Sequence, residues 1–181
     1  MHIKNSPSQY GLMTILLHWS MAVLIVGLFF LGDYMVDLTY YDPNYRTFPA
    51  LHKSIGFIVF TLLLLRILWH FNVGLPSPIA SLKVWEIRAS WVVHKILYIL
   101  ILLTTLSGYL ISTAKGQGID IFGLFTLPAL PFSIEQQEDI AGDLHDTLAH
   151  ALVFLALFHG IAGLKHHFIN KDATLRRMLG L

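Results

Sequence analysis

The chain has 181 residues, of which 55% are hydrophobic and 13% charged, and its formal net charge is +1. With a mean hydropathy of +0.64 it is too apolar for a soluble domain, and it has no basic run that would indicate nucleic-acid binding. Cysteine is absent, which excludes disulfides, thiolate-held iron–sulfur clusters and covalently attached c-type haem, so histidine is the expected ligand of any metal cofactor.

Four stretches are long and apolar enough to cross a bilayer. In chain order they are residues 11–31, 51–71, 91–113 and 144–168. No repeat or low-complexity segment interrupts them. We therefore expect a single membrane domain over residues 1–181, an all-α integral membrane bundle of four helices.

The basic residues predict how this bundle is oriented in the membrane. If the N-terminus is cytoplasmic, nine of the twelve Lys and Arg residues lie on the cytoplasmic side, and the exceptions are Arg46, Lys53 and Lys115. This distribution predicts that both termini are cytoplasmic and that the loops 33–50 and 114–143 lie outside.

The longer of the two outer loops contains Ser133 and Gln136, whose spacing is that of a capping box and predicts a short helix leading into the last span. Two interpretations of this loop stay open. It either covers the outer face of the bundle or is a plain connector.

The last span carries five of the ten histidines. Ionisable residues inside a membrane are functional candidates by default. His145 and His159 are 14 residues apart. This is just under four helical turns, so both imidazoles project from nearly one face, about 21 Å apart along the axis. The spacing predicts two separate sites.

Each of these two histidines has a counterpart at its own depth in another span. His18, in the first span, is level with His159, and His52, at the start of the second span, is level with His145. Two facing pairs stacked across a membrane are typical of proteins that bind two b-type haems, in which each iron takes one imidazole from each of two helices.

Two glycines favour this interpretation. Gly56 is four residues after His52, and Gly163 is four residues after His159, so each lies on the same helix face as its histidine. A missing side chain there would make room for a macrocycle. Ordinary tight helix contacts, which are common in membranes, are the alternative.

Three further residues are candidates for the cytoplasmic side of the bundle. Arg66 is 14 residues after His52, where it would reach the propionates of the inner haem or, alternatively, extend to lipid headgroups. His94 either contacts a propionate or quinone or is a solvated helix-end residue. His166, two turns after His159, either hydrogen-bonds a quinone or is an interfacial histidine of a basic tail.

Four short segments together resemble the bacterial cytochrome b561 family. They are Leu17–Trp19 (LHW), Leu51–Gly56 (LHKSIG), Leu144–His145 (LH) and Leu164–Leu175 (LKHHFINKDATL). The resemblance extends over essentially the whole chain, and the segments are specific in combination.

The resemblance implies a multi-pass protein of the bacterial inner membrane with two non-covalent b-type haems. His18 and His159 would hold the inner haem iron, and His52 and His145 the outer one. Electrons would pass between a periplasmic partner or oxidant and ubiquinone or menaquinone in the lipid. At least one member is similar to a superoxide oxidase that delivers the electron to ubiquinone.

Two other functions stay open at this stage. The chain could be the membrane haem subunit of a larger oxidoreductase complex instead of a stand-alone enzyme. A histidine-lined transporter of protons or divalent metal ions belongs to a different class. Against the transporter, the histidines pair by depth instead of forming a ladder, and the span interiors lack carboxylates.

Overall fold

The computed structural model describes residues 2–132 and 134–181. Four long helices make up most of it: α1 (Leu12–Val36), α2 (Thr47–Val73), α3 (Val84–Thr113) and α4 (Gln137–Lys165). Each is long and apolar enough to cross a membrane, where a helix satisfies its backbone hydrogen bonds within the segment. The prediction of a four-helix membrane bundle is confirmed. The helices extend beyond most of the predicted span ends, because the prediction included only the apolar stretch of each helix.

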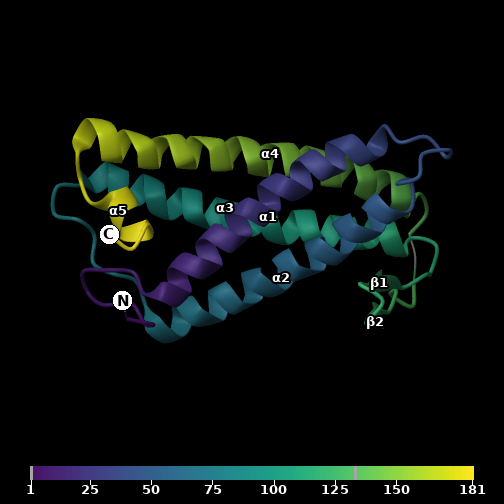
Figure 1. Ribbon diagram of the computed structural model, residues 1–181, viewed down its shortest axis with the longest axis horizontal. Coiled ribbons are helices and arrows are strands. Elements are labelled where there is room, and N and C mark those ends of the chain that lie inside the picture. The colour runs from purple at the N-terminus through teal and green to yellow at the C-terminus, as the bar shows by residue number, and fades with distance from the viewer. Residues whose placement is uncertain (1, 133) are drawn as a thin grey trace.

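The helices form two pairs, with α1 packed on α2 and α3 packed on α4, and α2 and α3 also in contact. Both chain termini lie at one end of the bundle, and a small β-hairpin lies at the other (Figure 1). We call these the terminal end and the hairpin end. Large apolar side chains such as Phe30 and Phe154 are exposed on the outside, as expected for helices that face lipid.

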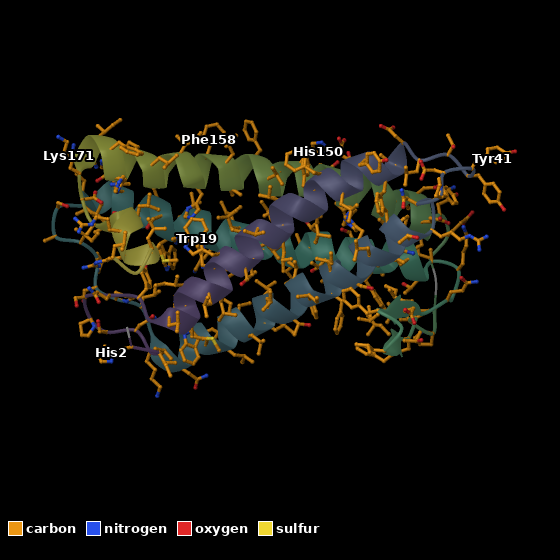
Figure 2. The ribbon with its side chains drawn as sticks, in the orientation of Figure 1. His2, Trp19, Tyr41, His150, Phe158 and Lys171 are labelled. Carbon is orange, nitrogen blue, oxygen red and sulfur yellow. The ribbon has the colours of Figure 1, made fainter. Side chains whose placement is uncertain are left out.

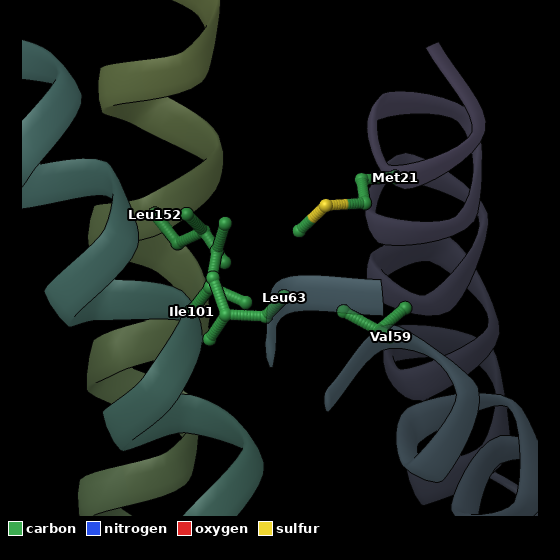
Figure 3. Packing of buried hydrophobic residues seen from close by; sticks show 5 residues of the cluster. All are labelled: Met21, Val59, Leu63, Ile101 and Leu152. Carbon is green, nitrogen blue, oxygen red and sulfur yellow. The ribbon is translucent and has the colours of Figure 1, made fainter. Parts of the chain in front are cut away.

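A small apolar core joins all four helices. It consists of Met21 from α1, Val59 and Leu63 from α2, Ile101 from α3 and Leu152 from α4 (Figure 3). Leu152 is seven residues from each of the two paired histidines of α4, which places the core halfway along the bundle. The core therefore separates the two ends of the bundle with close-packed side chains.

The loop between α3 and α4 contains an antiparallel hairpin, β1 (Ile119–Ile121) and β2 (Phe125–Leu127), which the sequence did not predict. Its turn has positive φ at Phe122 and Gly123, as tight hairpin turns require. The Ser54 hydroxyl of α2 donates to the Asp120 carbonyl at 3.4 Å and accepts from the Phe122 amide at 3.2 Å. The loop thus packs on the end of α2 instead of merely connecting two helices.

No separate short helix precedes α4 within the described residues 134–136, and α4 begins directly at Gln137. Gln136, which precedes it, is left-handed with φ 58°. The predicted capping box also involves Ser133, which lies outside the described residues.

The C-terminal segment folds back on the bundle. A turn of π-helix, η1 (His166–Asn170), follows α4, and the left-handed Lys171 reverses the chain into the short α5 (Thr174–Met178). The Trp19 indole donates a hydrogen bond to the Met178 carbonyl at 2.8 Å. The tail therefore closes the terminal end against α1; Figure 2 shows Trp19 close to this segment and Lys171 at the turn.

Candidate functional site

Two pairs of facing imidazoles lie inside the bundle, one toward each end. The terminal site consists of His18 from α1 and His159 from α4, whose ring centres are 6.1 Å apart with an interplanar angle of 74°. The hairpin site consists of His52 from α2 and His145 from α4, whose ring centres are also 6.1 Å apart, at 70°. The structure thus brings together the four histidines that the sequence pairs by depth.

The separation within each pair suits one metal ion bound between two imidazoles. A metal–nitrogen bond to histidine is about 2 Å long, and the ring centre lies about 1 Å behind the bonded nitrogen, so two rings sharing a metal have centres about 6 Å apart. Both pairs have this separation. The residues present therefore fit a bis-histidine iron at each site.

Hydrogen bonds at the hairpin site leave the correct nitrogen free. His145 Nδ1 lies 2.8 Å from the Thr104 carbonyl, which can only accept, so Nδ1 carries the proton and Nε2 keeps its lone pair. A backbone carbonyl on the second nitrogen is the usual way in which a protein orients a metal-binding imidazole. Among the described residues, the buried His52 Nδ1 has no hydrogen-bond partner.

Two glycines that the sequence did not single out make room for the hairpin-site rings. A Cβ at Gly32 of α1 would lie 3.3 Å from His52 Cε1, and a Cβ at Gly108 of α3 would lie 3.0 Å from His145 Cε1. Both glycines are on helices that contribute no histidine to this site. Only knowledge of which helices are neighbours, together with depth, could have identified them.

The glycines that the sequence did single out lie in open space. A Cβ at Gly56 or Gly163 would meet no heavy atom of the described residues within 4 Å, apart from the local helix. Their suggested role in making room for a macrocycle stays a prediction.

Arg66 lies at the terminal site. Its Nη2 is 3.1 Å from His18 Nδ1, and its guanidinium lies over the Tyr98 ring, 5.6 Å from the ring centre. Because a guanidinium only donates, this contact uses the lone pair of His18 Nδ1 and leaves the ring proton on Nε2. Metal binding through Nε2 would need that proton on Nδ1 instead, so what Arg66 would present to a bound metal is its charge and not this hydrogen bond. The depth predicted for Arg66 agrees with this placement, but its partner in the structure is an imidazole.

His94 adds a third imidazole to the terminal site. Its ring centre is 5.0 Å from that of His159, in an edge-to-face arrangement. Hence α3 contributes to this site as well, and His94 is in contact with a paired histidine.

His166 has a different environment from the one that helical extrapolation suggested. It lies in η1, and its Nδ1 is 2.7 Å from Asp172 Oδ2 and 3.1 Å from the Asn170 amide nitrogen. Burial raises the pKa of the Asp172 carboxyl, but hydrogen bonds from Thr174 and His166 lower it more, and the net pKa lies below its usual value. The contacts of His166 that the structure records thus belong to the C-terminal turn.

The remaining histidine of interest, His150, lies outside both sites. Its ring stacks edge to face on Phe29, with centres 5.1 Å apart, and its Nδ1 contacts Asp146. It is exposed on the surface of the bundle, as Figure 2 shows together with the outward-pointing Phe158 of the same helix.

Two basic residues of the hairpin end line one cavity. Arg46 and Lys53 border a space of about 320 Å³ between the start of α2 and β1, together with Ser112 and Asp120. Pro49, Ala50 and Ile119 line it as well, so its lining is mixed, and it lies at the same end of the bundle as the hairpin site.

A membrane bundle of four helices with paired imidazoles at its core defines the class of membrane-bound b-type cytochromes. Comparison with known proteins is more specific. Residues 9–181 match the family described as prokaryotic cytochrome b561, and the chain belongs to this family. It is accordingly a bacterial membrane electron carrier that binds b-type haem.

Three relatives cover nearly the whole chain. Cytochrome b561 homolog 2 of Escherichia coli K12 is 44% identical over 180 residues, which are 99% of this chain and 96% of that protein. Cytochrome b561 homolog 1 of the same organism is 27% identical over 95% of this chain and 97% of its own length. A probable superoxide oxidase of Yersinia pestis is 27% identical over 99% and 97%, respectively.

Proposed function

We propose that this chain binds two b-type haems and transfers single electrons between a donor at the hairpin end and membrane quinone. His18 and His159 would hold one iron, and His52 and His145 the other. The observation that carries this proposal is the identical 6.1 Å separation of ring centres in the two pairs, which leaves space for one bis-histidine iron in each.

When bound, haem supplies an iron that carries one electron by alternating between two oxidation states. The protein supplies ligation, spacing and environment. The helix α4 contributes one imidazole to each site and so fixes the distance between them. The core around Leu63 and Leu152 fills the space between the sites and excludes water from it.

We infer that the terminal end faces the cytoplasm. Lys83, Arg88, Lys165, Arg176 and Arg177 lie toward this end, whereas the hairpin end has Arg46, Lys53 and Lys115. The excess of basic residues supports cytoplasmic termini under the positive-inside rule. The hairpin site would then be on the periplasmic side.

Superoxide is the candidate donor that has the most support. The Yersinia pestis relative is named a probable superoxide oxidase. In addition, the cavity at the hairpin end is lined by two cations, Arg46 and Lys53, and one carboxylate, Asp120, and this excess of positive charge attracts an anionic donor. The outer loops 33–50 and 114–143 are acidic in sequence, so the support for an anionic donor comes from the fold.

A haem count tests the central part of this proposal. Purified protein should contain two haems per chain and show b-type bands in reduced-minus-oxidised spectra. His52→Ala and His159→Ala should each lose at least one haem. His150→Ala alters an exposed histidine of α4, the helix that carries His159, and should keep both haems. Retention of two haems with unchanged spectra in either of the first two variants would rule the ligand assignment out.

The donor is tested separately. Rapid mixing of superoxide with the oxidised, isolated protein should reduce haem quickly, and added quinone should reoxidise it. If only a separate periplasmic protein reduces the haem, the chain is the membrane subunit of a larger system. Membership in a family of membrane electron carriers argues against the transporter.

A further inference from the structure

The two sites differ in what lies behind one paired imidazole. At the terminal site, His18 Nδ1 faces the guanidinium of Arg66 at 3.1 Å. At the hairpin site, His145 Nδ1 faces the Thr104 carbonyl at 2.8 Å. A guanidinium is permanently charged and only donates, whereas a carbonyl is neutral and only accepts. One paired imidazole therefore has a permanent positive charge beside it, and the other has a neutral acceptor.

The carbonyl makes the hairpin-site imidazole a stronger electron donor. An imidazole N–H that donates to a carbonyl gains basicity at its other nitrogen, which favours the more oxidised form of a bound metal. The Ser107 hydroxyl donates to the same carbonyl at 2.9 Å and holds it in place. No cationic side chain is in hydrogen-bond contact with His145 among the described residues.

Arg66 has the reverse effect at the terminal site. The positive charge of its guanidinium, 3.1 Å from His18 Nδ1, favours any state with one more electron nearby. Within residues 2–132 and 134–181, Arg66 forms no ion pair with a carboxylate that would neutralise this charge. It lies between the faces of α1 and α3, against the Tyr98 ring, where screening by water is reduced.

We propose that Arg66 raises the reduction potential of the terminal site above that of the hairpin site and so gives electron transfer through the bundle its direction. This rests on the proposed function, because it requires a haem at each site. One electron leaves the hairpin site, which is oxidised by one unit, and arrives at the terminal site, which is reduced by one unit; no bond forms or breaks. Arg66 acts through the charge that it places beside His18 and is not itself a ligand.

Potentiometric titration of the haem bands in the intact protein tests this. Wild-type protein should titrate in two one-electron steps. In Arg66→Gln the higher of the two reduction potentials should fall by at least about 59 mV. For a one-electron couple this changes the electron distribution between the sites at least tenfold. Arg66→Lys keeps the charge and should retain most of the separation. Arg88→Gln removes an exposed cation of α3 toward the same end and should leave both steps in place.

The electron paramagnetic resonance spectrum of the oxidised protein supplies a second readout. Arg66→Gln should shift the signal of one ferric haem and leave the other unchanged. The proposal is overturned if Arg66→Gln keeps both haems with wild-type potentials, or if Arg88→Gln shifts them as much. It is also overturned if Arg66→Gln and Arg66→Lys both lose the terminal-site haem, because Arg66 would then be needed for binding. Failure of the proposed function would appear earlier, as a haem count below two in wild-type protein.

Discussion

The terminal and hairpin sites have the same ring separation but different surroundings. Around the terminal pair lie a guanidinium and a third imidazole, Arg66 and His94. At the hairpin pair, the recorded contacts are with neutral groups, the Thr104 carbonyl, the Ser107 hydroxyl and the backbone positions of Gly32 and Gly108. The comparison teaches that the bundle geometry sets the separation of the imidazoles, whereas residues on the helices beside each pair determine its chemistry.

The largest expected effect comes from filling the space beside the hairpin pair. In Gly108→Leu the new side chain would occupy the position of the His145 ring, since even a Cβ would lie 3.0 Å from its Cε1. The hairpin-site haem should be lost while the terminal site keeps its own, so a haem assay should find one haem per chain where the wild type is expected to have two. Gly160→Leu, which faces open space on α4, is the control. Equal loss of both haems in Gly108→Leu would contradict independent sites.

The C-terminal tail packs on the terminal end of the bundle, and we expect the Asp172 carboxylate to stabilise this packing. The pKa of its carboxyl lies below the usual value, so its stabilising effect is complete above the pKa of the unfolded chain and is lost as pH falls through the lower, folded value. Asp172→Asn should weaken docking of α5 by about 1–3 kcal/mol at neutral pH.

Hydrogen exchange at the α5 amides, corrected for the intrinsic effect of pH, measures this change. Wild-type protein should show faster exchange only in the acid range below the usual carboxyl pKa, whereas Asp172→Asn should exchange fast throughout. An acid response of equal size in the variant would show that another group controls the tail.

The hairpin end is closed through Ser54, and a smaller effect is expected there. In Ser54→Ala the Phe122 amide loses its acceptor, which costs about 1 kcal/mol and should loosen the hairpin from α2. Exchange at the amides of β1 and β2 should quicken while α5 is unaffected. Thr61→Ala removes a hydroxyl at an exposed position of α2 and is the control substitution, which should leave hydrogen exchange in the hairpin unchanged.

The smallest effect is expected from the third imidazole. His94→Leu removes the ring that packs on His159. It should alter the electron paramagnetic resonance signal of one ferric haem without changing the haem count. The signal of the other site should stay as in the wild type. Loss of a haem in this variant would mean that His94 is itself a ligand.

Much of the fold and the positions of the four paired histidines could be predicted from the sequence, for physical reasons. Hydrocarbon thickness fixes the length of a span, and the 14-residue separation of His145 and His159 fixes two depths on one helix face. These rules do not depend on detailed packing. That the pairs bind haem in these positions stays a prediction.

The unpredicted features have separate physical causes. The strands β1 and β2 have three residues each, too few for a periodic pattern, and their turn uses Phe122 at positive φ without an Asn-Gly signal. The bond between Arg66 and His18 depends on how α1 and α2 cross. The π-helical turn at His166 invalidated extrapolation from an ideal α-helix.

The place of α4 in the chain has a consequence for biosynthesis. Because α4 contributes an imidazole to both pairs, neither pair exists until the last of the four long helices has been made and has inserted beside the other three. During translation, His18 and His52 are single imidazoles on helices that already lie in the membrane. If the pairs bind haem as proposed, cofactor capture follows the insertion of α4, and a chain that ends before α4 has neither pair complete.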